Sequence, residues 1–493
     1  MTTTSTSHGL LHDLDWSGKI YADGWRKGSG QMTVTNKSTG ASLGTVGTAS
    51  AADVRSAAAS AAAHQPAWAA MSRQDRAAIL KRARALLTEH ADEFVWWLVR
   101  EAGSTVPKSQ FEVHVLTTGY FDKIIGDLET AAFEETIVDK DGFRSVVERV
   151  PLGVVGVIGP FNFPLILCMR AVIPALAFGN SVVLKPNQQT SVCSGILIAR
   201  LFEMAGLPQG VLDVVPGDVE PGEALVEDPD VAMIAFTGST AVGRKIGEVA
   251  GRTLKRVSLE LGGNSPFIVL EDADIEAAAR CGAWGSFLHQ GQICMAASRH
   301  LVHQSIAEKY AVALAEHARN LVVGDPAEGQ VHLGPIINDA QRERVDRIVK
   351  ETVAKGAKLA AGGTHQGNFY AATVLTGVTP GMRAFDEEIF GPVAPITTFA
   401  SDEEAVALAN KTEYGLSAAV HSASLPRARQ IAKRLRTGMV HINDQTVNDD
   451  PRIPFGGIGA SGNGSRQGGH ASLDEYTTWH WSTEHDTPPM YPF

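Results

Sequence analysis

The order of apolar and polar residues divides the chain into a helical first part and a longer part of alternating strands and helices. Residues 51–70 are rich in alanine, and residues 72–102 carry apolar side chains at helical spacing. These stretches predict helices, and the N-terminal third as a whole is expected to be helical. From Glu135 the period changes to two, and Asp141-Gly142 separates two alternating runs. This pattern predicts a β-hairpin.

Short apolar runs separated by helix-length segments follow the hairpin. Strand, helix and strand recurring at intervals of roughly 20–30 residues is typical of a parallel sheet. One set of runs precedes residue 271 and a second set follows residue 299, which predicts two α/β domains in series. The first set is 153–158, 181–184, 211–215, 231–236, 257–261 and 266–270, and the second is 300–303, 373–378, 396–399, 418–421 and 439–442.

The C-terminal stretch LDEYTTWHWSTEHD, residues 473–486, alternates like a strand but has no strand beside it in the sequence. We expect it to pair either with the hairpin that begins near Glu135 or with another subunit.

Length and composition limit the classes of function. A chain of 493 residues is expected to form two or three domains. The formal net charge of −11, without any Lys/Arg run, argues against nucleic acid or an anionic membrane as the main partner. The N-terminus lacks the pattern of a secretory signal, and the apolar runs are too short or too broken to span a bilayer.

The chain has four cysteines, Cys168, Cys193, Cys281 and Cys294. Four cysteines in so long a chain do not make a disulfide framework, and none of their spacings forms a CxxC metal pair. We therefore expect no metal site and a reducing, cytoplasmic location.

Three residues are separate candidates for catalytic chemistry. Cys294 lies in FLHQGQICMAAS, after a polar turn broken by glycine, where a thiol can be presented. Glu260 lies between leucines, and a carboxylate there is costly to bury unless it is paired or used. Asn162 in PFNFP can donate its amide to an oxyanion. The alternatives are a structural ion pair for Glu260 and a turn-stabilising role for Asn162.

Two segments are candidates for ligand binding. In FTGSTAVGRKIG a strand leads through Gly238 and Ser239 into a helix, whose N-terminal N–H groups can bind an anion; a plain strand-to-helix turn is the alternative. Arg244-Lys245 stands where a P-loop needs Lys-Ser/Thr, so a P-loop is excluded. Lys185 ends an apolar strand, where it faces the usual ligand crevice or is simply solvated.

A cysteine–histidine hydrolase is the main alternative from these residues. It needs a histidine base, but His300 and His303 lie three apart in a predicted strand and face opposite ways. His289 is also close to the cysteine in sequence. We regard a histidine base as disfavoured.

Together these segments resemble the aldehyde dehydrogenase superfamily over nearly the whole chain. LELGGNS is similar to the family's glutamate signature and FLHQGQICMAAS to its cysteine signature, while PFNFP, VVLKP, FTGST, EEIFGP and PFGG occur in the family's order. The longer segments NFPLILCMRAVIPALAFGNSVVLKP and WGSFLHQGQICMAASRHLVH are most similar to the branch of benzaldehyde, vanillin and salicylaldehyde dehydrogenases.

The resemblance implies an NAD(P)-dependent oxidation of an aldehyde, with an aromatic aldehyde as the expected substrate. Cys294 would attack the aldehyde, and its own N–H and the amide of Asn162 would hold the oxyanion. Loss of hydride would leave a thioester, and Glu260 would activate the water that hydrolyses it. The alternatives are an aliphatic aldehyde or semialdehyde as substrate, or CoA or phosphate in place of water. A thiol hydrolase and a non-catalytic binding protein on the same fold are further alternatives.

The resemblance also assigns cofactor residues. Many NAD-preferring members have glutamate where this chain has Gln188, and a neutral side chain repels a 2′-phosphate less, so NADP is possible. NAD is still expected, because the benzaldehyde-type branch includes NAD users. The assigned residues are Lys185 and Gln188 at the adenosine ribose, Gly238 and Ser239 at the pyrophosphate, Glu388 at the nicotinamide ribose, and Phe390 and Phe161 beside the nicotinamide.

One departure from the family concerns the substrate. Arg170 stands where several relatives with aliphatic substrates have an aromatic residue, and it either contacts a polar ring substituent or pairs with an acid. Apolar candidates for a flat-ring pocket, with ordinary core as the alternative, are Phe163, Ile166, Leu167, Ile293 and Met295.

The implied fold is α/β, with two Rossmann-type domains and a small β oligomerisation flap. The implied domains are a dinucleotide-binding domain of residues 1–134 and 151–260, a catalytic domain of 261–473, and a flap of 135–150 and 474–493. Pairing of the flap across subunits would make a homodimer or homotetramer.

Overall fold

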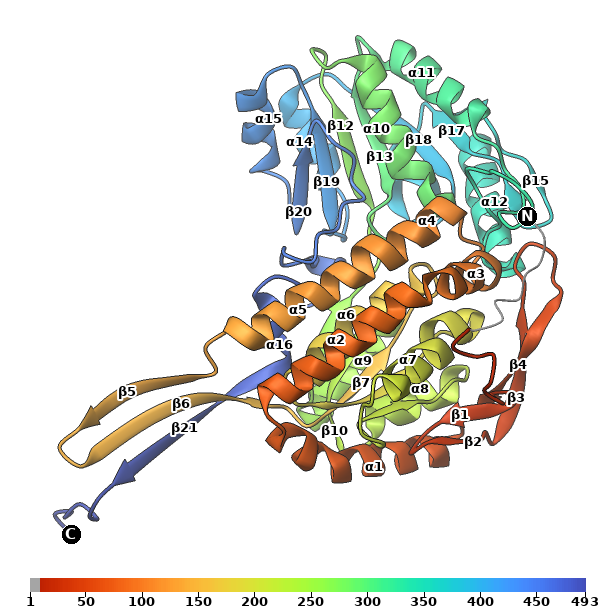
Figure 1. Cartoon of the computed structure of the whole chain (residues 1–493). Coiled ribbons are helices and arrows are strands. Elements are labelled where there is room, and N and C mark those ends of the chain that lie inside the picture. Colours follow the sequence, from red (N-terminus) through yellow and green to blue (C-terminus); the bar gives the residue numbers. More distant parts are fainter. Residues whose placement is uncertain (1–8) are drawn as a thin grey trace.

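A computed structural model describes residues 9–493 (Figure 1). It contains two large sheets of seven strands, one small sheet of three strands and two separate antiparallel pairs of strands. The predicted fold class, two parallel-sheet α/β units with a small extra sheet, is confirmed, and every strand predicted in the two sets is present. The grouping was wrong for the run 266–270, which was placed in the first set but belongs to the second large sheet. No helix in the described part of the chain is long and apolar enough to cross a membrane.

The first large sheet has seven strands in the order β11-β10-β7-β8-β9-β1-β2. Its parallel strands are β7 (Val154–Ile158), β8 (Ser181–Lys185), β9 (Leu212–Val214), β10 (Val231–Thr237) and β11 (Arg256–Glu260), and β1 (Lys19–Tyr21) and β2 (Trp25–Lys27) form an antiparallel edge. The chain proceeds from β7 to β8 and β9 on one side and returns to place β10 on the other. The strand order therefore reverses between β7 and β10.

Helices cover both faces of this sheet, which explains why its central strands β7, β8 and β10 are largely apolar. Neighbouring residues of one strand belong to different core clusters, as Val154 and Val155 do, because successive side chains point to opposite faces. One face packs against α1 (Ala51–Ala70), α8 (Val219–Glu227) and α9 (Thr240–Thr253). The other packs against α2 (Arg73–Glu89), α3 (Ala91–Glu101), α5 (Thr118–Thr130), α6 (Pro164–Ala177) and α7 (Leu197–Met204).

The second large sheet has the order β14-β17-β18-β13-β12-β19-β20. Its strands are β12 (Ser265–Val269), β13 (Ala297–His303), β14 (Lys358–Ala361), β17 (Thr373–Thr376), β18 (Val393–Phe399), β19 (Ser417–His421) and β20 (Met439–Ile442). One face carries α10 (Ile275–Phe287) and α11 (Ala307–Asn320), and the other carries α12 (Asp339–Ala354), α13 (Arg383–Asp386), α14 (Asp402–Ala409) and α15 (Leu425–Ala432).

The small sheet has the order β21-β6-β5 and extends away from the body, with the C-terminus near its tip (Figure 1). The hairpin of β5 (Glu134–Lys140) and β6 (Phe143–Pro151) turns at Asp141 and Gly142, whose φ values are 54° and 76°. Positive φ at both central residues is the geometry that an Asp-Gly hairpin favours. The C-terminal strand β21 (Thr477–His485) pairs antiparallel with β6, so the first of the two predicted pairings is confirmed.

Several local predictions were wrong. The N-terminal third is not wholly helical, because it also contains β1, β2 and the antiparallel pair β3 (Gly30–Thr35) and β4 (Ser42–Thr48). These strands are short or carry many polar residues, so their period is weak. Leu473 to Tyr476 belong to a helix, α16 (Ala471–Tyr476), since burial of Tyr476 decides the conformation of so short a run. The short strands β14, β15 (His365–Gln366) and β16 (Phe369–Tyr370) were not predicted.

Candidate active site

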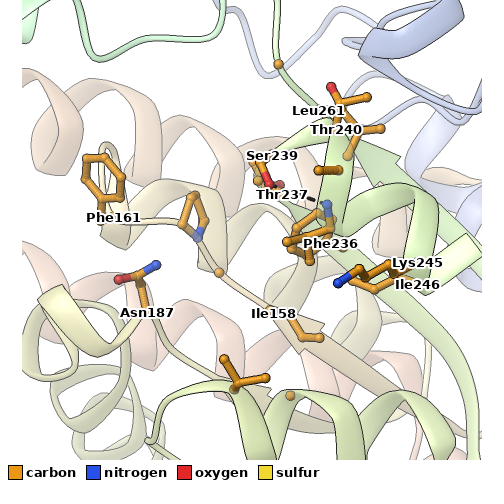
Figure 2. A pocket seen from close by; sticks show the side chains of 18 of the residues that line it. Ile158, Phe161, Asn187, Phe236, Thr237, Ser239, Thr240, Lys245, Ile246 and Leu261 are labelled. Carbon is orange, nitrogen blue, oxygen red and sulfur yellow. Dashed lines mark hydrogen bonds between the residues drawn. The ribbon is translucent and has the colours of Figure 1, made fainter. Parts of the chain in front are cut away.

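An elongated cavity of about 1020 Å³ lies at the carboxyl ends of β7, β8 and β10 and reaches Cys294. It opens where the strand order reverses, which is the usual ligand position in an open α/β sheet. Figure 2 shows Ile158 at the end of β7, Phe236 and Thr237 at the end of β10, and Ser239 at the start of α9 around this cavity.

Cys294 lies between the 3-10 turn Leu288–Gly291 and strand β13, where the backbone is unusual. His289, Gln290 and Gly291 all have positive φ, at 49°, 57° and 65°. Three consecutive left-handed residues are rare and, in non-glycine residues, strained. A Cβ atom on Gly263 would collide with the carbonyl oxygen of Cys294, so the glycine permits the close approach of the two loops.

The surroundings of Cys294 favour the neutral thiol. Burial, together with the nearby carboxyl groups of Glu388 and Glu260, raises the pKa of the Cys294 thiol to about 12. Arg170 acts in the opposite direction. Thiolate formation at this site therefore depends on a cation or a base brought close to the sulfur.

Asn162 is buried and joins the two loops of the site. It follows β7 and precedes α6, and its Nδ2 donates a hydrogen bond of 2.9 Å to the backbone carbonyl of Gln292. This bond aims the amide at the segment that carries Cys294. Asn162 thus does more than stabilise its own turn.

Glu260 ends β11 and has a buried carboxyl group whose two oxygens find no hydrogen-bond partner in residues 9–493. No salt bridge to it is present in this part of the chain either, so the alternative of a structural ion pair was wrong. Burial raises the pKa of Glu260 to about 8, although the charges of Arg170 and Arg466 lower it. An unpaired buried carboxyl group with a raised pKa is a common sign of a functional site.

All of the predicted cofactor residues line the same cavity as Asn162 and Cys294. Ser239 is the N-cap of α9, with its hydroxyl accepting from Val242 N at 3.4 Å, and the free N–H groups of this helix end favour an anion. Burial lowers the pKa of Lys185 to about 8, and Asp218 opposes this shift. The set consists of Lys185, Gln188, Gly238, Ser239, Glu388, Phe390 and Phe161.

Glu388 and Phe390 lie on a loop that faces Cys294 across the cavity. Glu388 Oε1 accepts a hydrogen bond from Gly263 N at 2.9 Å, and burial raises the pKa of Glu388 to about 7. Phe390 has a φ of 53°, and its ring stands edge-on to Phe161 with 5.8 Å between centroids. Both rings line the cavity.

The predicted substrate residues do not all line the cavity. Leu167 does, whereas Phe163, Ile166, Ile293 and Met295 are buried in the core around it. Arg170 forms a buried salt bridge with Asp449, and its guanidinium lies 4.4 Å from the centre of the Phe455 ring. Pairing with an acid is therefore what Arg170 does in this structure.

Arg170 is also part of a polar cluster under the site. Arg170 Nε, Asp449 Oδ1 and the Tyr120 hydroxyl lack hydrogen-bond partners within the described chain. The charge of Arg170 acts on both Cys294 and Glu260, so the cluster is close to the candidate catalytic groups.

The histidines do not support a hydrolase. No histidine nitrogen is hydrogen-bonded to the sulfur of Cys294 in the region described. His300 is buried between Ser286 and Tyr310, and burial lowers the pKa of His300 to about 3. Nor does any group of three His, Cys, Asp or Glu residues between positions 9 and 493 form a metal site.

Some residues of the site were missed by sequence reasoning. Gln292 is the acceptor for Asn162, and Lys108 and Glu112 contact the backbone around Asn162. The i,i+4 spacing of Lys108 and Glu112 is a signal of an ion pair on a helix, but such spacing is common on solvated surfaces. Asp218 and Tyr414 also line the cavity.

Residues 25–482 match the aldehyde dehydrogenase family. The chain is 50% identical to a benzaldehyde dehydrogenase (NAD(+)) of Pseudomonas putida, over 97% of this chain and 98% of that protein. It is also 50% identical to a vanillin dehydrogenase of an Amycolatopsis species, over 98% of this chain and 100% of that protein.

A solved structure is similar over the whole fold. The crystal structure of betaine aldehyde dehydrogenase from Staphylococcus aureus in complex with NAD+ superimposes with a TM-score of 0.93 at 29% identity. The match covers 98% of this chain and 97% of that chain.

Proposed function

Because the chain belongs to the aldehyde dehydrogenase family, we propose that it oxidises an aromatic aldehyde to the carboxylic acid with NAD as the hydride acceptor. The observation that carries the chemistry is that Cys294, Asn162 and the predicted cofactor residues line one continuous cavity. The aromatic substrate follows from the names of the relatives from Pseudomonas putida and Amycolatopsis.

The reaction begins when the Cys294 thiolate attacks the aldehyde carbon and forms a thiohemiacetal. The Asn162 amide exchanges its bond to the Gln292 carbonyl for a bond to the new oxyanion, and the N–H of Cys294 is the second donor. This exchange needs little movement, because Gln292 is only two residues from Cys294.

Bound NAD supplies the acceptor for the hydride that leaves the thiohemiacetal, so that a thioester remains on Cys294. Glu260 then takes a proton from a water molecule, and the resulting hydroxide attacks the thioester carbon. The carbon–sulfur bond breaks, the acid leaves, and the thiolate returns. The unpaired, buried carboxyl group of Glu260 suits a base that must accept and release a proton near neutral pH.

The residues of the cavity fit a dinucleotide. An anion-binding helix end at Ser239, a lysine at the end of β8 and a carboxylate at Glu388 lie along one elongated space. Gln188 has no carboxylate to face the adenosine ribose. Two other carboxylates, those of Asp218 and Glu223, line the same cavity. Their negative charge disfavours the 2′-phosphate of NADP, which supports NAD as the preferred cofactor.

The alternatives make different demands on the site. A semialdehyde dehydrogenase would share the chemistry and differ only in the substrate it accepts. A CoA-acylating or phosphorylating enzyme would not need Glu260 as a base for water. A thiol hydrolase would need a histidine beside Cys294, and a binding protein would need neither Cys294 nor Glu260.

The test follows NADH absorbance with purified protein, benzaldehyde, and NAD or NADP in parallel, beside Cys294→Ala and an aliphatic aldehyde. Reduction of NAD with benzaldehyde that is lost in Cys294→Ala is the expected result. Oxidation of the aliphatic aldehyde alone would overturn the aromatic substrate. Reduction that requires CoA or phosphate would overturn hydrolysis by Glu260-activated water.

We further propose that the enzyme is a cytoplasmic homodimer or homotetramer assembled through the small sheet. Strand β21 is an edge strand and exposes Trp479 and Trp481, at 54% and 68% of their surface, on one face. Exposed tryptophans beside an open sheet edge are suited to pairing between subunits. Sedimentation of the intact protein and of Trp479→Ser/Trp481→Ser tests the assembly.

In the proposed division of the chain, residues 1–134 and 151–260 bind the dinucleotide, 261–473 form the catalytic domain, and 135–150 with 474–493 form the flap.

A further inference from the structure

A buried ion pair stands directly behind the oxyanion site. Lys108 on α4 (Val106–Phe111) and Glu112, which begins the π-helical segment Glu112–Thr117, approach within 2.5 Å of each other. Their side chains are 1% and 0% exposed. Removing two charges from water costs several kcal/mol per ion, so a pair of this kind needs a compensating role. π-Helical segments, moreover, are frequent at functional sites.

The ammonium of Lys108 binds the backbone of the residue that carries the oxyanion donor. Lys108 Nζ donates to the carbonyl oxygen of Asn162 at 2.8 Å and to Ser104 Oγ at 3.2 Å. The same Nζ lies 3.9 Å from the centre of the Phe163 ring, the residue that follows Asn162. The ammonium therefore fixes both the peptide and the neighbouring ring on one side of the Asn162 amide.

The carboxylate of Glu112 binds the start of the following helix. Glu112 Oε1 accepts from Leu165 N at 2.9 Å and from Ile166 N at 3.1 Å, two of the N–H groups that the first turn of α6 leaves without helical partners. Phe163, the N-cap residue, supplies no side-chain cap itself. Glu112 thus replaces the missing cap from another element and fixes the chain three residues after Asn162.

We propose that Lys108 and Glu112 are positioning residues for the oxyanion site, which hold the backbone on both sides of Asn162 so that its amide faces Cys294. The inference rests on the proposed role of Asn162 in aldehyde oxidation. Donors to an oxyanion act only when they are held in place before the reaction. A displacement of such a donor by about 1 Å lowers the rate by up to about a hundredfold.

The test is a double-mutant cycle. Lys108→Met/Glu112→Met removes both charges together with the hydrogen bonds to the Asn162 carbonyl and to the start of α6, and it roughly keeps the side-chain volumes. It is measured with Asn162 intact and in an Asn162→Ala background. If the pair acts through the Asn162 amide, kcat/KM for the aldehyde falls about tenfold with Asn162 intact and less than about twofold without it. Equal losses in the two backgrounds, or no loss, would overturn the proposal.

A milder variant covers the case in which the double substitution does not fold. Ser104→Ala removes one partner of the Lys108 ammonium, and Ser104 makes no hydrogen bond to residues 162–166 in the described chain. We expect Ser104→Ala to lower kcat/KM for the aldehyde about threefold, and we expect this loss to disappear in the Asn162→Ala background. Lys123→Met is the matched control, since Lys123 pairs with Asp127 at the same i,i+4 spacing on α5. It should leave the rate unchanged.

The cycle is also run with p-nitrophenyl acetate in the absence of NAD. Its acyl group passes to the Cys294 sulfur with release of p-nitrophenolate, a step that needs the oxyanion site but neither an aldehyde nor a cofactor. If the protein does not oxidise benzaldehyde, the proposed substrate is refuted. The release of p-nitrophenolate then still measures the effect of each variant on the oxyanion site. The dissociation constant of NAD, from quenching of protein fluorescence, should change less than about twofold in every variant, whereas a general structural defect would raise it.

Discussion

The side-chain amide of Asn162 donates a 2.9 Å hydrogen bond to the backbone carbonyl of Gln292, and this bond joins the loop after β7 to the loop that presents Cys294. The two residues are 130 positions apart in the sequence. Asn162 follows a strand of the first large sheet and Gln292 precedes a strand of the second, so the distance between donor and nucleophile is set by the packing of the two large sheets.

Removal of the amide should therefore act on the reaction and not on cofactor binding. We expect Asn162→Ala to lower kcat by about 10²- to 10³-fold, the usual effect of losing one oxyanion donor. The dissociation constant of NAD should stay unchanged, because the bond of Asn162 is to Gln292 and not toward Lys185 or Ser239. Steady-state kinetics and fluorescence titration check this, and a change confined to NAD binding would contradict it.

Glu260→Gln should separate the two halves of the reaction. The hydride leaves before water attacks, so the variant should form about one NADH per active site and then stall at the thioester. Stopped-flow absorbance measures the burst, and intact-mass spectrometry detects the acyl group on Cys294. If the burst of NADH is lost together with the steady-state rate, Glu260 acts in a step before the thioester forms.

The pH dependence follows from the same carboxyl group. Burial raises the pKa of Glu260 to about 8, so below pH 8 the group is mostly protonated and cannot accept a proton from water. We expect the hydrolysis of the thioester to quicken as pH rises through 8 and to level off above it. At pH 6 a burst of NADH should precede a slow steady state. A hydrolysis rate that is constant from pH 6 to 9 would contradict this assignment.

Asp218 should contribute to the choice between NAD and NADP. It lines the cavity and acts electrostatically on Lys185, while Gln188 carries no charge. Asp218→Asn should raise kcat/KM for NADP about tenfold, the equivalent of removing about 1.4 kcal/mol of repulsion, with little effect on NAD. Glu276→Gln, an exposed carboxylate outside the cavity, is the control. An equal gain in kcat/KM for NADP in both variants would indicate that the net charge of the protein, and not the position of Asp218, is the cause.

The buried pair Arg170–Asp449 should be important for stability. Arg170→Met leaves Asp449 as an uncompensated buried charge, which typically costs about 3–5 kcal/mol. Arg170→Met/Asp449→Leu removes both charges and should recover most of the loss. Urea and thermal unfolding of the three proteins measure this. If the double variant is as unstable as the single one, packing of Arg170 against Phe455 is the larger contribution.

The local periodicity of the sequence was enough to locate most elements of the fold. The strands of both large sheets are buried on two faces and therefore appear as continuous apolar runs between helix-length segments. The Asp141-Gly142 turn was also evident, because few residue pairs adopt two successive positive φ angles. The strands β1 to β4 were missed, because β1 and β2 have only three residues each and the polar and half-exposed residues of β3 and β4 give no clear period.

The chemical identity of the site was also contained in the sequence, since a thiol, an amide and a carboxylate in long characteristic segments point to one reaction. Only the tertiary structure decided which partners these groups have. It placed Lys108 and Glu112 behind Asn162, paired Arg170 with Asp449 and left Glu260 without a partner. The physical reason is that periodicity reflects which face of an element is buried, whereas hydrogen bonds, ion pairs and pKa shifts depend on distances between elements far apart in the chain.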